Sequence, residues 1–79
     1  MQVYETNENG EMDYKGNVIF IYGMKLEMLS KQVATLKGFM RFENNRRIYP
    51  EIVVFNRRLT NEEISRYELI PIGEKIEWL

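Results

Sequence analysis

The side chains of this 79-residue chain that are best suited to binding chemistry are arginines in its central third. They are Arg41, Arg46, Arg47, Arg57 and Arg58. Residues 37–58 carry six basic and two acidic side chains, a net charge of +4, whereas residues 1–16 and residues 59–79 each carry a net charge of −3. This segregation predicts one basic face between two acidic segments, although the total charge is only −1.

Aromatic residues are interleaved with these arginines, and Tyr49 is the most polar of them. A guanidinium group beside an aromatic ring suits phosphate contact with base stacking, and Arg and Tyr are also enriched at the energetic centres of protein interfaces. The predicted binding residues are Arg41, Arg46, Arg47, Tyr49, Arg57 and Arg58. The simpler alternative is that these charges are solvated and balance the acidic segments in space.

Catalytic chemistry has few side chains available, because the chain contains neither Cys nor His. The usual general base near neutral pH and the commonest metal ligands are therefore missing. Glu62 and Glu63 could form a carboxylate pair, but helix capping explains both. The acidic residues Glu8, Glu11 and Asp13 supply too few well-spaced oxygen ligands for a divalent cation. We therefore predict a non-enzymatic protein with no metal and no cofactor.

The strands that must position these residues follow from β-branched runs and turn signals. Asn9 and Gly10 predict the turn of a β-hairpin, and the run NVIFIY at Asn17–Tyr22 predicts a buried central strand. Further strands are expected at residues 39–42 and 51–55, the second directly after Pro50. A turn at residues 73–74 and a last strand at residues 75–79, with Trp78 as an anchor, complete the expected strands.

Two helices are predicted. The apolar positions Leu26, Leu29, Val33, Leu36 and Met40 are spaced 3, 4, 3 and 4, which predicts an amphipathic helix at about residues 25–37, ended by Gly38. Thr60 and Glu63 form a capping-box pattern that predicts a short helix at about residues 61–67. We expect the first helix to pack on its own sheet, although the same spacing also fits an intermolecular zipper of about two heptads.

These elements predict an α+β fold in a single domain, residues 1–79, with an antiparallel sheet of four to five strands. A chain of this length buries only about 60% of its unfolded surface, and with no Cys it has no disulfide to reinforce a small core. Self-association, or docking on a larger partner, is therefore the expected reinforcement.

The segment EIVVFNRRLTNEEI and the residues that follow it, Glu51 to Tyr67, resemble the closing motif of laminin-G-like, concanavalin-type jelly-roll domains. In that family a strand runs into an Asn-Arg turn, a Ser/Thr cap and a short helix. The resemblance covers about 17 of 79 residues and implies that Leu59 and Ile64 pack against the strand. It implies a segment that holds the fold closed instead of a ligand site, and it suggests a virion or surface-associated protein.

The sequence therefore favours a non-enzymatic protein-interaction or assembly module, such as a structural, accessory or inhibitor protein, with a partner that is either a second copy or another protein. Its brevity suggests a phage or another mobile element as its source. The alternative is a nucleic-acid or nucleotide binder that uses residues 37–58. No signal peptide or membrane span is expected, so a cytoplasmic location is predicted, in the host cytoplasm or in a virion if the protein is phage-encoded.

Overall fold

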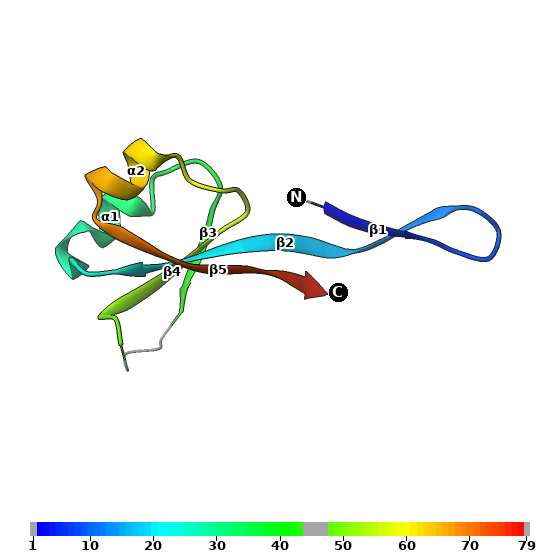
Figure 1. Cartoon of the computed structure of the whole chain (residues 1–79), viewed down its shortest axis with the longest axis horizontal. Helices are drawn as coiled ribbons and strands as arrows, with labels where there is room; N and C mark the ends of the chain where they lie inside the picture. The colour runs from blue at the N-terminus through cyan, green and yellow to red at the C-terminus, as the bar shows by residue number, and fades with distance from the viewer. Residues whose placement is uncertain (1, 44–47, 79) are drawn as a thin grey trace.

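The computed structural model describes residues 2–43 and 48–78, which form one antiparallel sheet with short helices (Figure 1). The described elements, in chain order, are β1 (Gln2–Thr6), β2 (Met12–Met24), the 3-10 turn η1 (Glu27–Leu29), α1 (Ser30–Val33), β3 (Phe39–Glu43), β4 (Glu51–Phe55), α2 (Asn61–Arg66) and β5 (Leu69–Trp78). The predicted α+β class is therefore confirmed in outline, with five strands and little helix.

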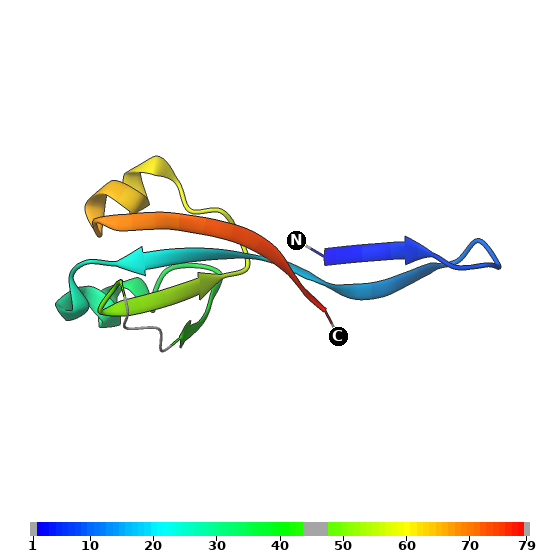
Figure 2. The same ribbon diagram turned by 60° about the horizontal axis from the view of Figure 1, so that its bottom comes forward.

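The long strand β2 organises the sheet, because three other strands pair with it. Gly16 and Asn17 pair with β1 and β5 at once, and residues 20–24 pair with β4 and β5 at once. It follows that β1 and β4 lie one after the other along one edge of β2, and that β5 lies along the other edge. β3 pairs with the outer edge of β4. The hairpin β1–β2 extends away from the helices, and the molecule measures 50 × 26 × 17 Å (Figures 1 and 2).

The core lies at the end of the sheet where β2 pairs with β4. Apolar side chains from β2, β4 and the start of β5 pack there against Val33 of α1 and against Ile64 of α2. The hydroxyl oxygen of Tyr22 accepts a hydrogen bond from the backbone N–H of Leu59 at 2.9 Å, which joins the segment before α2 to the sheet. The buried members of this core are Phe20, Tyr22, Met24, Val33, Val53, Phe55, Leu59 and Leu69.

The predicted hairpin and central strand are both present. Gly10 has a φ of +80°, as the predicted turn requires, and the side-chain oxygen of Asn7 accepts hydrogen bonds from the backbone N–H groups of Asn9 and Glu11 at 2.9 and 3.0 Å. The central strand extends beyond the predicted Asn17–Tyr22 at both ends. The capping box of Thr60 and Glu63 forms as predicted, and α2 begins at Asn61.

The helix predicted at residues 25–37 is much shorter in the structure. A 3-10 turn at Glu27–Leu29 leads into four α-helical residues that end at Val33, and tight turns follow. The hydroxyl groups of Ser30 and Thr35 donate to the backbone carbonyls of Glu27 and Gln32, so these side chains bond to the local backbone in the way that disfavours a regular helix. The regular spacing of apolar residues therefore does not come from one long helix. A series of short turns packs these residues instead.

The strand predicted at residues 75–79 is present in residues 75–78, but the turn predicted before it at residues 73–74 is not. β5 begins at Leu69 and continues through Pro71 and Gly73, where a turn had been expected. A register shift between Ile21 and Tyr22 of β2 places a bulge in this pairing, at residue 72 of β5. Pro71 is tolerated because β5 is an edge strand in the described part of the chain. Trp78 is 58% exposed and does not anchor the strand in the core.

Candidate interaction surface

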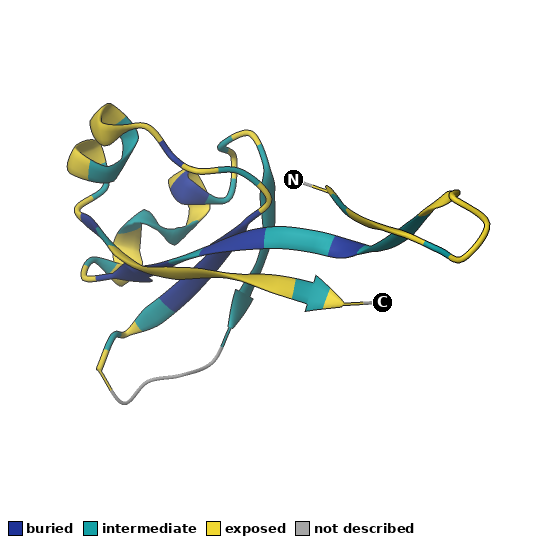
Figure 3. Cartoon of the chain, turned by 45° about the vertical axis from the view of Figure 1, so that its right-hand side comes forward, coloured by how far each residue is buried: buried dark blue, intermediate teal, exposed yellow. Residues whose placement is uncertain are grey.

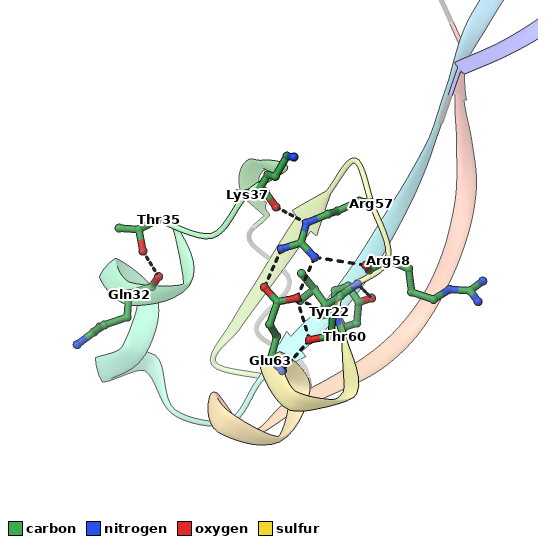
Figure 4. Close-up of polar contacts among 9 residues, drawn as sticks. Tyr22, Gln32, Thr35, Lys37, Arg57, Arg58, Thr60 and Glu63 are labelled. Carbon is green, nitrogen blue, oxygen red and sulfur yellow. Dashed lines mark hydrogen bonds and ion pairs between the residues drawn. The ribbon is translucent and has the colours of Figure 1, made fainter.

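Arg57, predicted to be a binding residue, is held by several contacts within the fold (Figure 4). Its Nε donates to the carbonyl oxygen of Lys37 at 2.6 Å, and its two terminal nitrogens donate to the carboxylate of Glu63 at 2.8 and 2.7 Å. The hydrogen bonds from Arg57 and from the backbone of Thr60 lower the pKa of Glu63 to about 2. Arg57 therefore joins the end of the segment after α1 to the start of α2.

Arg58 lies on the solvent side of the same loop. Its guanidinium donates to Glu74 of β5 at 2.8 Å, and its Cζ lies 5.7 Å from the centre of the Phe20 ring. Arg58 is well exposed, so the ion pair itself adds little stability. A shallow pocket beside it is lined by Phe20, Asn56, Arg57 and Arg58.

Arg41 of β3 points to the face of the sheet opposite the helices. Its guanidinium lies 3.1 Å from Glu43 and 2.7 Å from Glu77 of β5, and these carboxylates, Glu77 first, raise the pKa of Arg41. Because β3 and β5 are separated in the sheet by β4 and β2, a direct contact between Arg41 and Glu77 requires a curled sheet. The ion pair therefore connects the two edges across the curled face.

Tyr49 also lies on this curled face. Its ring occupies the space above Gly23, so that a Cβ at Gly23 would lie 2.7 Å from the ring. A pocket of about 240 Å³ adjoins Tyr49 and is lined by Ile21, Glu43, Ile48, Tyr49, Ile52 and Ile72. The two remaining predicted binding residues, Arg46 and Arg47, lie outside the described residues.

The structure does not gather the described arginines into one basic face. Arg41, Arg57 and Arg58 are paired with Glu77, Glu63 and Glu74, all of which come from the acidic segment 59–79. Arg66, the fourth arginine in the described ranges, pairs with Glu62 at 2.6 Å. For these residues the simpler alternative holds, in which segregated charges balance one another in space.

A different surface is prominent, at the end of the sheet away from the helices. We call it the sheet extension and define it as β1, residues 12–18 of β2 and residues 74–78 of β5. Figure 3 shows that exposed residues dominate β1, the hairpin loop and most of β5. Among the described residues seven large hydrophobic side chains are exposed, and four of them are in the sheet extension. These are Tyr4 (44%), Met12 (62%), Ile76 (37%) and Trp78 (58%).

The strand register places apolar side chains on both faces of the sheet extension. Paired residues on antiparallel strands point to the same face, so Val18 and Ile76 share the face that carries the helices further along the sheet. Trp78 lies beside Gly16 on that face. On the other face the rings of Tyr4 and Tyr14 are in contact, with their centres 5.6 Å apart. Two exposed faces therefore present apolar side chains that the chain's own described helices do not cover.

The sequence predicted the hairpin and the last strand of the sheet extension, but their exposed apolar surface was not identified, although one signal was present. Along residues 74–78, charged Lys75 and Glu77 alternate with apolar Ile76 and Trp78, which is the period of a strand with two different faces. The surface was not recognised because Trp78 was expected to be an anchor, whereas it is 58% exposed.

Comparisons of the chain with protein-family models, with curated proteins and with solved structures gave no match. The resemblance of residues 51–67 to laminin-G-like domains therefore stays a prediction. Within residues 2–43 and 48–78, none of the helices has the length and apolar character needed to cross a membrane.

Proposed function

We propose that this protein is a non-enzymatic protein-interaction or assembly module and that the sheet extension is its contact surface. One observation carries the proposal: Tyr4, Met12, Ile76 and Trp78 are exposed on paired strands that no described helix covers. Aromatic residues and Met are enriched in the cores of protein interfaces. Exposed apolar side chains on both faces of a sheet are typical of a surface that another protein covers.

The charge distribution favours a protein over a nucleic acid as the partner. Each arginine in the described ranges already has a carboxylate within 3.1 Å, so a phosphate would have to displace that carboxylate. Glu63, with a pKa of about 2, is ionised at neutral pH and is unsuited to donate a proton as a general acid. The cytoplasmic location stays a prediction.

The proposal is tested by site-specific photo-crosslinking in cells that produce the protein. A benzophenone amino acid placed at Trp78 should give discrete protein adducts that resist nuclease and are removed by protease. The same group at Met28, which is exposed on η1 outside the sheet extension, is the matched control and should give none. Absence of protein adducts from Trp78, or adducts that nuclease removes, would contradict the proposed function.

A titration with single-stranded oligonucleotide at low salt separates the two classes of partner. We expect no binding, because the described arginines are neutralised. Binding that weakens steeply as salt rises would instead indicate phosphate contacts and the nucleic-acid alternative.

A further inference from the structure

We propose that the partner of this surface is a second copy of the chain, which pairs with it edge to edge through residues 74–78 of β5 about a twofold axis. The two sheets then continue into one another as antiparallel strands. This inference rests on the proposed function and specifies its partner.

The outer edge of β5 is available for such pairing. β5 has ten residues, and within the described part of the chain it pairs with β2 alone. Figure 1 shows the C-terminal part of β5 running out beyond the helices, with β2 on one side and no other described strand or helix drawn along the other. A strand edge of this kind presents unpaired backbone N–H and C=O groups, which another strand can satisfy. Pro71, which cannot donate a hydrogen bond, lies outside the proposed stretch.

The charges of β5 select the register. In a twofold antiparallel pair the residue at the axis faces its own copy, and residues at equal distances on either side face one another. An axis at Glu74, Lys75 or Glu77 would place two like charges opposite each other, which is destabilising. An axis at Ile76 places Ile76 against Ile76 and brings Lys75 opposite Glu77 twice. This register alone, among axes at positions 74–77, combines an apolar centre with two opposite-charge pairs.

The two faces of the paired strands are then both complementary. On the face that carries Val18, the two Ile76 side chains meet, and Trp78 of each copy lies diagonal to Ile76 of the other, within reach of an aromatic ring. Trp78 also lies opposite Glu74 of the other copy, which already pairs with Arg58. On the opposite face lie the Lys75–Glu77 pairs. Glu77 already accepts from Arg41, and its second carboxylate oxygen leaves it able to face Lys75 as well. The charge pattern and the apolar pattern thus both fit the second copy.

A competing explanation is that Lys75 and Pro71 keep this edge unpaired, since charged residues and Pro commonly protect exposed strand edges. The two explanations predict different masses in solution, so sedimentation velocity or light scattering over a range of protein concentration decides between them. We expect the wild-type chain to sediment as a dimer at micromolar concentration and above. A monomer throughout that range would overturn the inference.

Charge exchange tests the register. K75E and E77K each place two like-charge pairs in the interface, so each should raise the dimer dissociation constant at least about tenfold. An equimolar mixture should form a 1:1 heterodimer, because the K75E copy then presents two carboxylates to the two ammonium groups of the E77K copy. Failure of the mixture to associate, when both variants are folded by circular dichroism, would overturn the inference.

K31E is the control variant, because it makes the same charge change on exposed Lys31 of α1 and should leave the dimer unchanged. K75E is the cleaner of the two single variants, since no described ion pair involves Lys75, whereas E77K also removes a partner of Arg41. If wild type and K75E dimerise equally, the second copy binds elsewhere and the inference fails. If the wild type is monomeric but the probe at position 78 still crosslinks to another protein, this inference fails while the proposed function stands.

Discussion

Glu63 shows how one side chain can serve both local and tertiary structure. Its carboxylate accepts from the backbone N–H of Thr60 at 2.9 Å, which closes the capping box, and it also accepts two hydrogen bonds from Arg57. The sequence predicted the first contact, because a capping box depends on residues three positions apart. The second contact connects Glu63 to the loop before α2 and through Arg57 to Lys37, which lies 20 residues earlier than Arg57.

We expect the stability of the protein to fall as the pH drops from about 4.5 towards 2. The pKa of Glu63 is lowered in the folded state from 4.5 to about 2, so protonation favours the unfolded chain across that window. E63Q should unfold at lower urea concentration at pH 7, by about 1–2 kcal/mol from the lost cap and ion pair, and should lose less stability than the wild type on acidification. Urea titrations followed by circular dichroism at pH 7, 4 and 2.5 measure both effects.

E62Q is the control for this prediction. Glu62 is exposed and pairs only with Arg66 among the described side chains, so its replacement should change the stability by less than about 0.5 kcal/mol. An equal loss in E62Q and E63Q would mean that first-turn charge, and not the Arg57 contact, stabilises α2.

At the scale of elements, the pairing of β2 with β5 depends on Gly16. A Cβ at this position would overlap the backbone carbonyl oxygen of Glu77, and the residue has a φ of +155°. Gly73, in the same strand pair, has open space where its Cβ would be. The two glycines therefore have different roles, which only the strand register reveals.

We predict that G16A destabilises the protein by about 1–3 kcal/mol and that G73A changes its stability by less than about 1 kcal/mol. The physical reason is the close approach of β5 to Gly16. Chemical denaturation of the two variants beside the wild type measures the difference, and amide hydrogen exchange should show faster exchange in residues 74–78 of G16A. Equal stability of the two variants would contradict the described register.

An element was easier to predict when the interactions that form it join residues that are close in the sequence. The Asn9–Gly10 turn and the α2 cap were predictable because their hydrogen bonds join residues a few positions apart. The helix at residues 25–37 was over-predicted because apolar spacing reports which side chains are buried, and tight turns can bury Val33 as well as a helix can. The last strand was predicted at residues 75–79, but its first half was missed because Pro71 and Gly73 usually end strands, and an edge position with a bulge accommodates them.

At the scale of the whole molecule, the fold is elongated and its core occupies one end. The radius of gyration is 14.8 Å, against about 12 Å for a compact domain of this length. The core around Phe55 lies beneath α1 and α2, while the sheet extension depends on strand pairing with little cover. Small domains of this kind gain stability when a partner buries more of their surface.

If the second copy reinforces the fold, the midpoint of thermal unfolding should rise with protein concentration. The rise expected for the wild type is about 3–5 °C for each tenfold increase, because dissociation is coupled to unfolding. K75E should unfold at a midpoint that depends less on concentration than the wild-type midpoint does, because its dimer is weaker. Scanning calorimetry at several concentrations measures both, and a wild-type midpoint independent of concentration would contradict reinforcement by a second copy.

The sequence by itself determined the features that depend on neighbouring residues: the hairpin turn, the central strand through Ile19, the capping box at Thr60 and the mixed fold class. Only the tertiary structure decided which partners the charged side chains have and which apolar side chains are exposed. It paired Arg41 of β3 with Glu77 of β5, and it left Trp78 exposed on an edge strand. The physical reason is that turn and cap hydrogen bonds close over a few residues, whereas the partners of a guanidinium or an indole are chosen by strand register, which sets contacts dozens of residues apart.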